Sequence, residues 1–276
     1  MGLRIASNLA AERVQANLRK VTNKSDKALE RLSSGKRIIQ AADDSAGLAI
    51  AKSIEAQVRG LKQASRNTND AISLIQTAEG SLNETSNILS RLKELAVQSA
   101  SDTLGDKERE MLNLEFEQLI SEVDRVANNT KYNGVNLLNG EGNDLYQFQV
   151  GPNSDESNVI EFDTTEIDAT SGTLGVDGLT ILDRDDALDS IEMVDEAISL
   201  LSNQRAGLGA IQNRMQSAVN TIDNQAIQQE YARSIIEDVD VAESTSQLAK
   251  SVIQKNAAIS ALAQANTIPR TAIELI

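Results

Sequence analysis

The chain has 276 residues, a formal net charge of −15, two prolines and neither histidine nor cysteine. Without imidazole or thiol groups, the sequence excludes an HExxH zinc site, a Ser–His pair, a zinc finger and a disulfide framework. The acidic balance argues against nucleic acid as a partner, and the 2% share of aromatic residues predicts a core of aliphatic side chains along extended helical seams.

The ends of the sequence show no membrane signal. The stretch Met1–Asn8 has no apolar run of the length found in cleaved signal peptides. No run of about 18 apolar residues occurs along the chain, so we expect no membrane insertion. The last residues, Ile273–Ile276, are apolar but too short to anchor the chain in a bilayer.

An apolar ladder with alternating steps of four and three residues predicts the first helix. The ladder consists of Val14, Leu18, Val21 and Leu32, with Ser25 and Ala28 at the intervening positions. This spacing places one mostly apolar stripe along a single helix face. Gly35 suits the left-handed position that ends such a helix.

A second ladder predicts an unusually long helix from about residue 44 to residue 100, with an aspartate as its cap. At 1.5 Å per residue this helix would extend about 85 Å, so it needs a partner helix along its length. A third helix is predicted to end near Asn128-Asn129. The pairs Asn133-Gly134 and Asn139-Gly140 that follow are turn signals.

The middle of the chain changes its hydrophobic period. The segments Leu145–Val150 and Val159–Phe162 alternate apolar and polar residues, and Gly151–Ser154 between them has turn residues. This pattern predicts a β-hairpin at about 145–163. The stretch Asp163–Thr180 is rich in Gly, Thr, Ser and Asp, which favours loops.

The helical pattern resumes at Ala187, and a final helix is predicted to end at Pro269. This last helix carries Val241, Leu248, Val252, Ile259 and Leu262. The chain therefore runs out along long helices, turns through a small β region and returns along two more. This order predicts a mainly α fold, in which long antiparallel helices form a coiled-coil-like bundle with a small β-hairpin region.

Seven blocks of sequence, taken in order, are typical of one protein family. They are Leu29–Ile38, Ala41–Ile50, Ser90–Ser99, Asn133–Val135, Arg205–Arg214, Asp238–Ser244 and Leu262–Asn266. Each block alone is a weak signal, but their joint order and spacing are specific. The chain thus resembles bacterial flagellin, the subunit of the flagellar filament, over nearly its whole length.

The resemblance implies two domains. An inner core domain would consist of residues 1–42 and 236–276, in which the terminal helices pair. An outer core domain of residues 43–235 would hold the long helices and the hairpin. Only the residues between Asn139 and Ala187 are left for further structure. The chain would therefore be a short form that lacks the additional outer domains of many members.

The resemblance also implies a structural function. The chain would be a secreted molecule that is exported unfolded through the flagellar type III apparatus and self-assembles into the extracellular filament of the bacterial flagellum for swimming motility. No enzyme activity and no cofactor are expected. Two alternatives stay open: the hook–filament junction protein of the same superfamily, and a helical adaptor that does not polymerise.

The partners follow from the same resemblance. They are further copies of the chain in a helical homopolymer, the flagellar export chaperone at the C-terminal helix, and the filament cap and hook-junction proteins. Residues expected to pack in the inner core or between subunits are Val14, Leu18, Val21, Leu32, Val241, Leu248, Val252, Ile259 and Leu262. We expect both termini to become ordered only on assembly, because isolated helices of this kind are marginal in water.

Three residues match positions through which the family is recognised by the vertebrate flagellin-sensing Toll-like receptor. They are Arg91, Leu95 and Glu115. Because Arg91 and Leu95 are four residues apart, they are expected to share a helix face. The alternative is that this face contacts only neighbouring subunits, which would bury Leu95.

Clusters of aspartate could indicate carboxylate pairs or a calcium site. These are Asp43-Asp44, Asp102 with Asp106, and Asp183 with Asp185-Asp186. No EF-hand spacing occurs, so we interpret them as helix caps and solvated loops, and we predict no metal site and no catalytic residue.

Three lysines near the N-terminus could form a basic patch. Lys20, Lys24 and Lys27 are close in sequence, but Asp26 and Glu30 are interleaved with them. We interpret this stretch as a solvated helix face.

Overall fold

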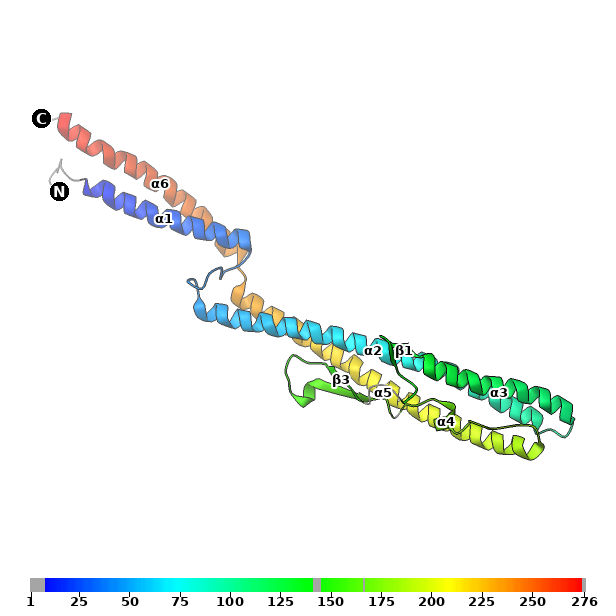
Figure 1. The fold of residues 1–276 in the computed structure, drawn as a ribbon. Coiled ribbons are helices and arrows are strands. Elements are labelled where there is room, and N and C mark those ends of the chain that lie inside the picture. Colours follow the sequence, from blue (N-terminus) through cyan, green and yellow to red (C-terminus); the bar gives the residue numbers. More distant parts are fainter. Residues whose placement is uncertain (1–7, 141–144, 166, 275–276) are drawn as a thin grey trace. The chain divides into compact units, whose positions relative to one another are not determined.

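The computed structural model describes residues 8–140, 145–165 and 167–274 and consists mainly of long helices (Figure 1). Its elements in chain order are α1 (Leu9–Ser34), α2 (Ser45–Ser99), α3 (Asp106–Asn129), β1 (Lys131–Tyr132), β2 (Val135–Asn136), β3 (Leu145–Gln149), the 3₁₀ turn η1 (Glu156–Asn158), β4 (Val159–Asp163), α4 (Ser171–Leu174), α5 (Arg184–Glu237) and α6 (Val241–Glu274). The predicted fold class, long helices with a small β-hairpin region, is confirmed.

The chain divides into two compact units. The terminal unit consists of residues 1–57 and 228–276, and the central unit consists of residues 58–227. The helices α2 and α5 each contribute residues to both units. The inner and outer core domains, with their predicted boundaries at 42/43 and 235/236, stay a prediction.

In the terminal unit, α1 and α6 lie side by side (Figure 1). The predicted ladder forms the less exposed face of α1, on which Val21 and Ala28 are buried and the other members are partly buried. Gly35 ends the helix with a φ of 70°, in the left-handed conformation that its sequence position predicts.

The buried residues of α6 are small. Ser244, Ser251, Ala258 and Ala265 recur every seven residues and are each at most 9% exposed. A heptad period of this kind keeps one seam of the helix toward its partner. Because these side chains are short, the seam buries little apolar area for its length.

The helix α6 continues to Glu274, whereas the sequence predicts its end at Pro269. A proline inside a helix leaves the carbonyl four residues earlier without its usual donor, here that of Ala265. The side-chain nitrogen of Asn8 donates a hydrogen bond to this carbonyl at 2.9 Å. The start of α1 therefore supplies a bond that the proline removes.

The central unit has a continuous hydrophobic core along α2, α3 and α5, and the hairpin residues join it. Its largest fully buried side chains are Phe116, Phe162, Leu61, Ile75, Leu82, Leu89, Leu92, Leu95, Leu137, Leu138, Ile181 and Leu201. From Leu61 onward, the long ladder predicted for the second helix thus faces the core, which explains how most of this helix of 55 residues is held in place. Within the described residues, no helix is both long and apolar enough to cross a bilayer.

Two hairpins form where the sequence predicts turns. Strands β3 and β4 pair antiparallel, with Tyr146 opposite Phe162 and ring centroids 6.2 Å apart. Strands β1 and β2 flank Asn133 and Gly134, whose φ angles of 50° and 84° fit the two-residue turn that Asn-Gly favours. The predicted loop region additionally holds the single helical turn α4, which has too few residues to show a period.

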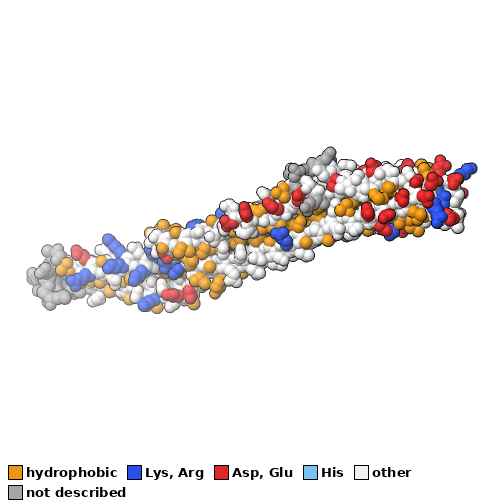
Figure 2. All heavy atoms as spheres, turned by 90° about the horizontal axis from the view of Figure 1, so that it is seen from below, with side chains coloured by type: hydrophobic (Ala, Val, Ile, Leu, Met, Phe, Trp, Pro, Cys, Tyr) orange, Lys and Arg blue, Asp and Glu red, His pale blue; other side chains and the backbone are white. Residues whose placement is uncertain are grey.

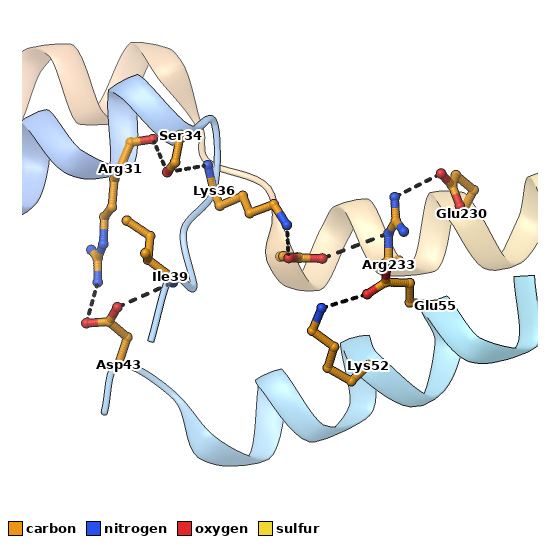
Figure 3. A network of polar contacts seen from close by, with 10 residues as sticks. Arg31, Ser34, Lys36, Ile39, Asp43, Lys52, Glu55, Glu230 and Arg233 are labelled. Carbon is orange, nitrogen blue, oxygen red and sulfur yellow. Dashed lines mark hydrogen bonds and ion pairs between the residues drawn. The ribbon is translucent and has the colours of Figure 1, made fainter. Parts of the chain in front are cut away.

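Two connectors of the terminal unit are bonded to each other (Figure 3). The amide of Arg37 donates to the carbonyl of Glu237 at 2.7 Å, and the amide of Val239 donates to the carbonyl of Gly35 at 3.0 Å. The Lys36 ammonium lies 2.5 Å from Glu237 Oε1, and the Glu237 side chain is only 7% exposed. The two connectors therefore form one short antiparallel bridge.

Asp43 fixes the turn between α1 and α2 (Figure 3). Its carboxylate lies 3.3 Å from the Lys27 ammonium and 3.9 Å from the Arg31 guanidinium. It also accepts the amides of Ile39 and Gln40 at 3.4 and 3.3 Å. The hydrogen bond from Lys27, followed by the one from the Gln40 amide, lowers the pKa of Asp43 below its ordinary value.

The lowered pKa makes this turn sensitive to acid. Ionised Asp43 stabilises the folded turn above the unfolded pKa of about 3.9, and this contribution is lost as the pH falls through the lower folded pKa. We expect hydrogen-exchange protection of the Ile39 and Gln40 amides to fall over this acidic range. The variant Asp43→Asn should have weaker protection at neutral pH and a flatter pH profile.

The exposed Asp26 on α1 provides the matched control. Asp26→Asn should leave the protection of both amides and its pH profile as in the wild type. Identical profiles for wild type and Asp43→Asn would contradict the assignment of this turn to Asp43.

Candidate assembly and recognition surfaces

The residues expected to pack at the termini fall into two groups. Those buried or partly buried within the chain are Val14, Leu18, Val21, Leu32, Leu248 and Leu262. The remaining three, Val241, Val252 and Ile259, are 58%, 44% and 48% exposed. These three side chains lie on α6 outside its buried seam. Their role between subunits stays a prediction, and nothing within the described chain covers them.

A second exposed apolar row lies on the last third of α5. Ile227, Tyr231 and Ile235 are 63%, 66% and 64% exposed and are spaced four residues apart. Residues with this spacing share one helix face. The sequence shows this spacing, but the positions of apolar residues alone do not distinguish an exposed row on α5 from a buried one. The row adds a second surface that would lose water on assembly.

Arg91 and Glu115 meet on the surface of the central unit. The Arg91 guanidinium, on α2, donates to Glu115 Oε1 on α3 through Nε at 3.1 Å and through Nη2 at 2.9 Å. Its third contact is Glu94 Oε2 at 2.9 Å, one helical turn further along α2. The hydrogen bonds from Arg91 to Glu94 and then to Glu115 raise the pKa of Arg91. The structure thus brings two of the three predicted recognition residues together.

Leu95, the third residue of the predicted recognition site, lies in the hydrophobic core. Its side chain is 0% exposed within the single chain. The four-residue spacing to Arg91 places the two residues on adjoining sides of α2, and the boundary between core and solvent passes between them. A direct contact of a partner with Leu95 therefore does not fit this structure.

The aspartate clusters act structurally where their contacts are seen. Asp44 Oδ1 accepts the amide of Gly47 at 2.9 Å in the first turn of α2. Asp102 Oδ2 lies 3.4 Å from the guanidinium of Arg184. Over the described ranges, no group of three or more acidic residues is arranged to hold a metal ion.

Both helical parts of the chain match known family patterns. Residues 5–143 match the family described as the bacterial flagellin N-terminal helical region. Residues 191–276 match the family described as the bacterial flagellin C-terminal helical region. The two matches together cover most of the helical residues of both units.

Individual relatives agree with these matches. A flagellin of Halalkalibacterium halodurans is 41% identical over 272 residues, which cover 99% of either chain. A flagellin of Bacillus subtilis is 36% identical over 99% of this chain and 100% of its own length. The crystal structure of Bacillus cereus flagellin, 30% identical, aligns with a TM-score of 0.51 over 57% of this chain and 88% of that chain. The chain therefore belongs to the bacterial flagellin family.

Proposed function

We propose that the chain is the structural subunit of a bacterial flagellar filament and serves swimming motility. The observation that carries this proposal is the match of both terminal helical regions together with relatives named flagellin that align over their full length. A protein of Treponema maltophilum named as a flagellar filament core protein is 36% identical over 90% of either chain. The role is mechanical, so it requires neither catalysis nor a cofactor.

Filament growth needs contacts that join different surfaces of successive subunits. Such heterologous contacts continue without closing when the rotation between subunits does not complete a ring. The exposed rows on α6 and α5 are apolar surfaces of the kind that polymerisation would cover. The seven-residue spacing of Val252 and Ile259 additionally suits packing of α6 against a further helix.

Export and assembly assign further partners to the same helices. The chain would pass unfolded through the flagellar type III apparatus to the cell exterior. Before export, the dedicated chaperone would cover the exposed row of α6. After export, the filament cap and the hook-junction proteins would contact the subunits at the two ends of the polymer. The similar lengths of this chain and its relatives support a short form without additional outer domains.

Reassembly tests the filament proposal directly. After depolymerisation by heat or acid and return to neutral pH with seeds, the wild type should form long helical filaments in electron micrographs. Val252→Asp/Ile259→Asp should remain soluble, because burying two unpaired carboxylates at a contact costs several kcal/mol. The matched variant Val252→Ile/Ile259→Val keeps an apolar row and should polymerise.

The wild-type result separates the alternatives. Short rings would favour the hook–filament junction protein, and no polymer under any seeding condition would favour a non-polymerising adaptor. Filaments from the double aspartate variant at the wild-type concentration would reject a role for this row while leaving the filament proposal in place.

We further propose recognition by the vertebrate flagellin-sensing Toll-like receptor through Arg91 and Glu115, with Leu95 acting only as packing beneath them. Arg91→Ala and Glu115→Ala should each weaken signalling about tenfold or more in a receptor reporter assay, as expected for loss of a charged hydrogen bond. Arg125 and Glu122 form a comparable exposed pair on α3, so Arg125→Ala is the matched control. Unchanged signalling by both variants would reject the site.

A further inference from the structure

Five of the six cations of α1 form a row along one side of the helix, and the sixth, Arg19, points about 110° away from it. At about 100° per residue, the row falls within roughly 40° of one direction on the helix. Its members are Arg13, Lys20, Lys24, Lys27 and Arg31. The acids that interleave with them in sequence, Asp26 and Glu30, point roughly 130° and 90° away from the centre of the row. Lys20, Lys24 and Lys27 are exposed, as a solvated helix face requires. Interleaving in sequence does not place the acids on the same side of the helix, so they do not neutralise the row.

The basic row borders a groove between α1 and α6, inside the terminal unit. The groove has a volume of about 760 Å³ and is lined by Val14, Asn17, Lys20, Val21, Asn23, Lys24, Lys27, Gln254, Ala257, Ala258 and Ala261. None of these lining residues is acidic. Lys27 is engaged by Asp43, whereas Lys20 and Lys24 have no ion-pair partner among the described residues. Figure 2 shows Lys and Arg side chains gathered over the part of the surface that the terminal helices form.

The same unit presents an acidic segment at the start of α6. Asp238, Asp240 and Glu243 are exposed, and none of them forms an ion pair within the described chain. Asp240 caps the helix by accepting the amides of Ala242 and Glu243 at 2.8 and 3.0 Å. Val241 lies between these carboxylates and is 58% exposed. The segment thus combines negative charge with one apolar side chain.

Within one chain, the acidic segment lies too far along α6 to contact the groove. From Val241 to Ala258, α6 advances about 25 Å at 1.5 Å per residue. The two surfaces are complementary in charge, and the apolar floor of the groove, with Val14, Val21 and three alanines, suits the Val241 side chain. Complementary patches at different places on one molecule make a heterologous contact that propagates.

We propose that the segment 238–243 of one subunit docks on the groove between α1 and α6 of the next copy. This inference rests on the proposed filament function and names one contact within it. Lys20 and Lys24 pair with Asp238 and Glu243 of the neighbour, and Val241 enters the groove. The charge pairs set the register of the contact, as charges flanking an apolar seam do between paired helices.

A charge exchange tests the contact by the critical concentration for polymerisation. Lys20→Glu/Lys24→Glu should raise this concentration about tenfold or more. At each contact, two weak surface ion pairs with the acidic segment of the neighbour are replaced by repulsion between carboxylates. Asp238→Lys/Glu243→Lys should act similarly. The chain that carries all four substitutions should recover to near the wild-type value. Circular dichroism of each monomer should match that of the wild type, which checks that the substitutions leave the fold of the free chain unchanged.

A control with the same change in net charge uses exposed lysines of the central unit. Lys62→Glu/Lys107→Glu should leave the critical concentration within about twofold of the wild type. An equal rise in this control, or no recovery in the fourfold variant, would overturn the proposal. The proposal would also be overturned if the monomer bound anionic phospholipid vesicles through Lys20 and Lys24 while the lysine variant polymerised as the wild type does. A wild type that fails to polymerise would instead reject the filament function itself.

Discussion

The antiparallel pairing of segments from opposite ends of the chain is the constraint on which the terminal unit depends. The helices α1 and α6 are far apart in sequence and hold together along a seam whose buried α6 residues are serine and alanine. At about 25 cal/mol per Å² of buried apolar surface, such short side chains contribute little stabilisation. This stabilisation offsets only a small part of the backbone entropy that two long helices lose on ordering. Stability of this pair is therefore expected to rise when a neighbouring copy covers its exposed apolar row.

The central unit does not share this shortage of buried apolar surface. Every residue of the main hydrophobic cluster lies between Leu61 and Ile222, and its helices bury leucine, isoleucine and phenylalanine side chains. Three helices and a hairpin enclose this cluster, so the unit has a core of its own. The contrast between the two units is compatible with the proposed unfolded export and later assembly, because the part with the weaker core is the part that includes both chain ends.

Hydrophobic period predicted most of the architecture, because long ladders such as the one through Leu82 and Leu89 leave little choice of structure. It could not predict features that depend on contacts between distant segments. Leu95 and Arg91 share a spacing but lie on opposite sides of the core boundary, which only the packing of α3 defines. Buried Arg109 likewise donates to the carbonyls of Ser99 and Ser101 at 2.9 and 3.1 Å, a helix-end contact without a local sequence signal.

The distribution of charge separates the two units as clearly as their cores do. The central unit has 12 Lys and Arg against 29 Asp and Glu, a net charge of −17, whereas the terminal unit has 14 against 12, a net charge of +2. Strong like charge keeps the central units of free subunits apart, and it opposes close approach of those units in a polymer. A nearly neutral terminal unit with separate basic and acidic patches has no such barrier. Attraction between oppositely charged patches is therefore available in the terminal unit, whose apolar seam is weak. Electrostatic repulsion is concentrated in the central unit, which has its own hydrophobic core.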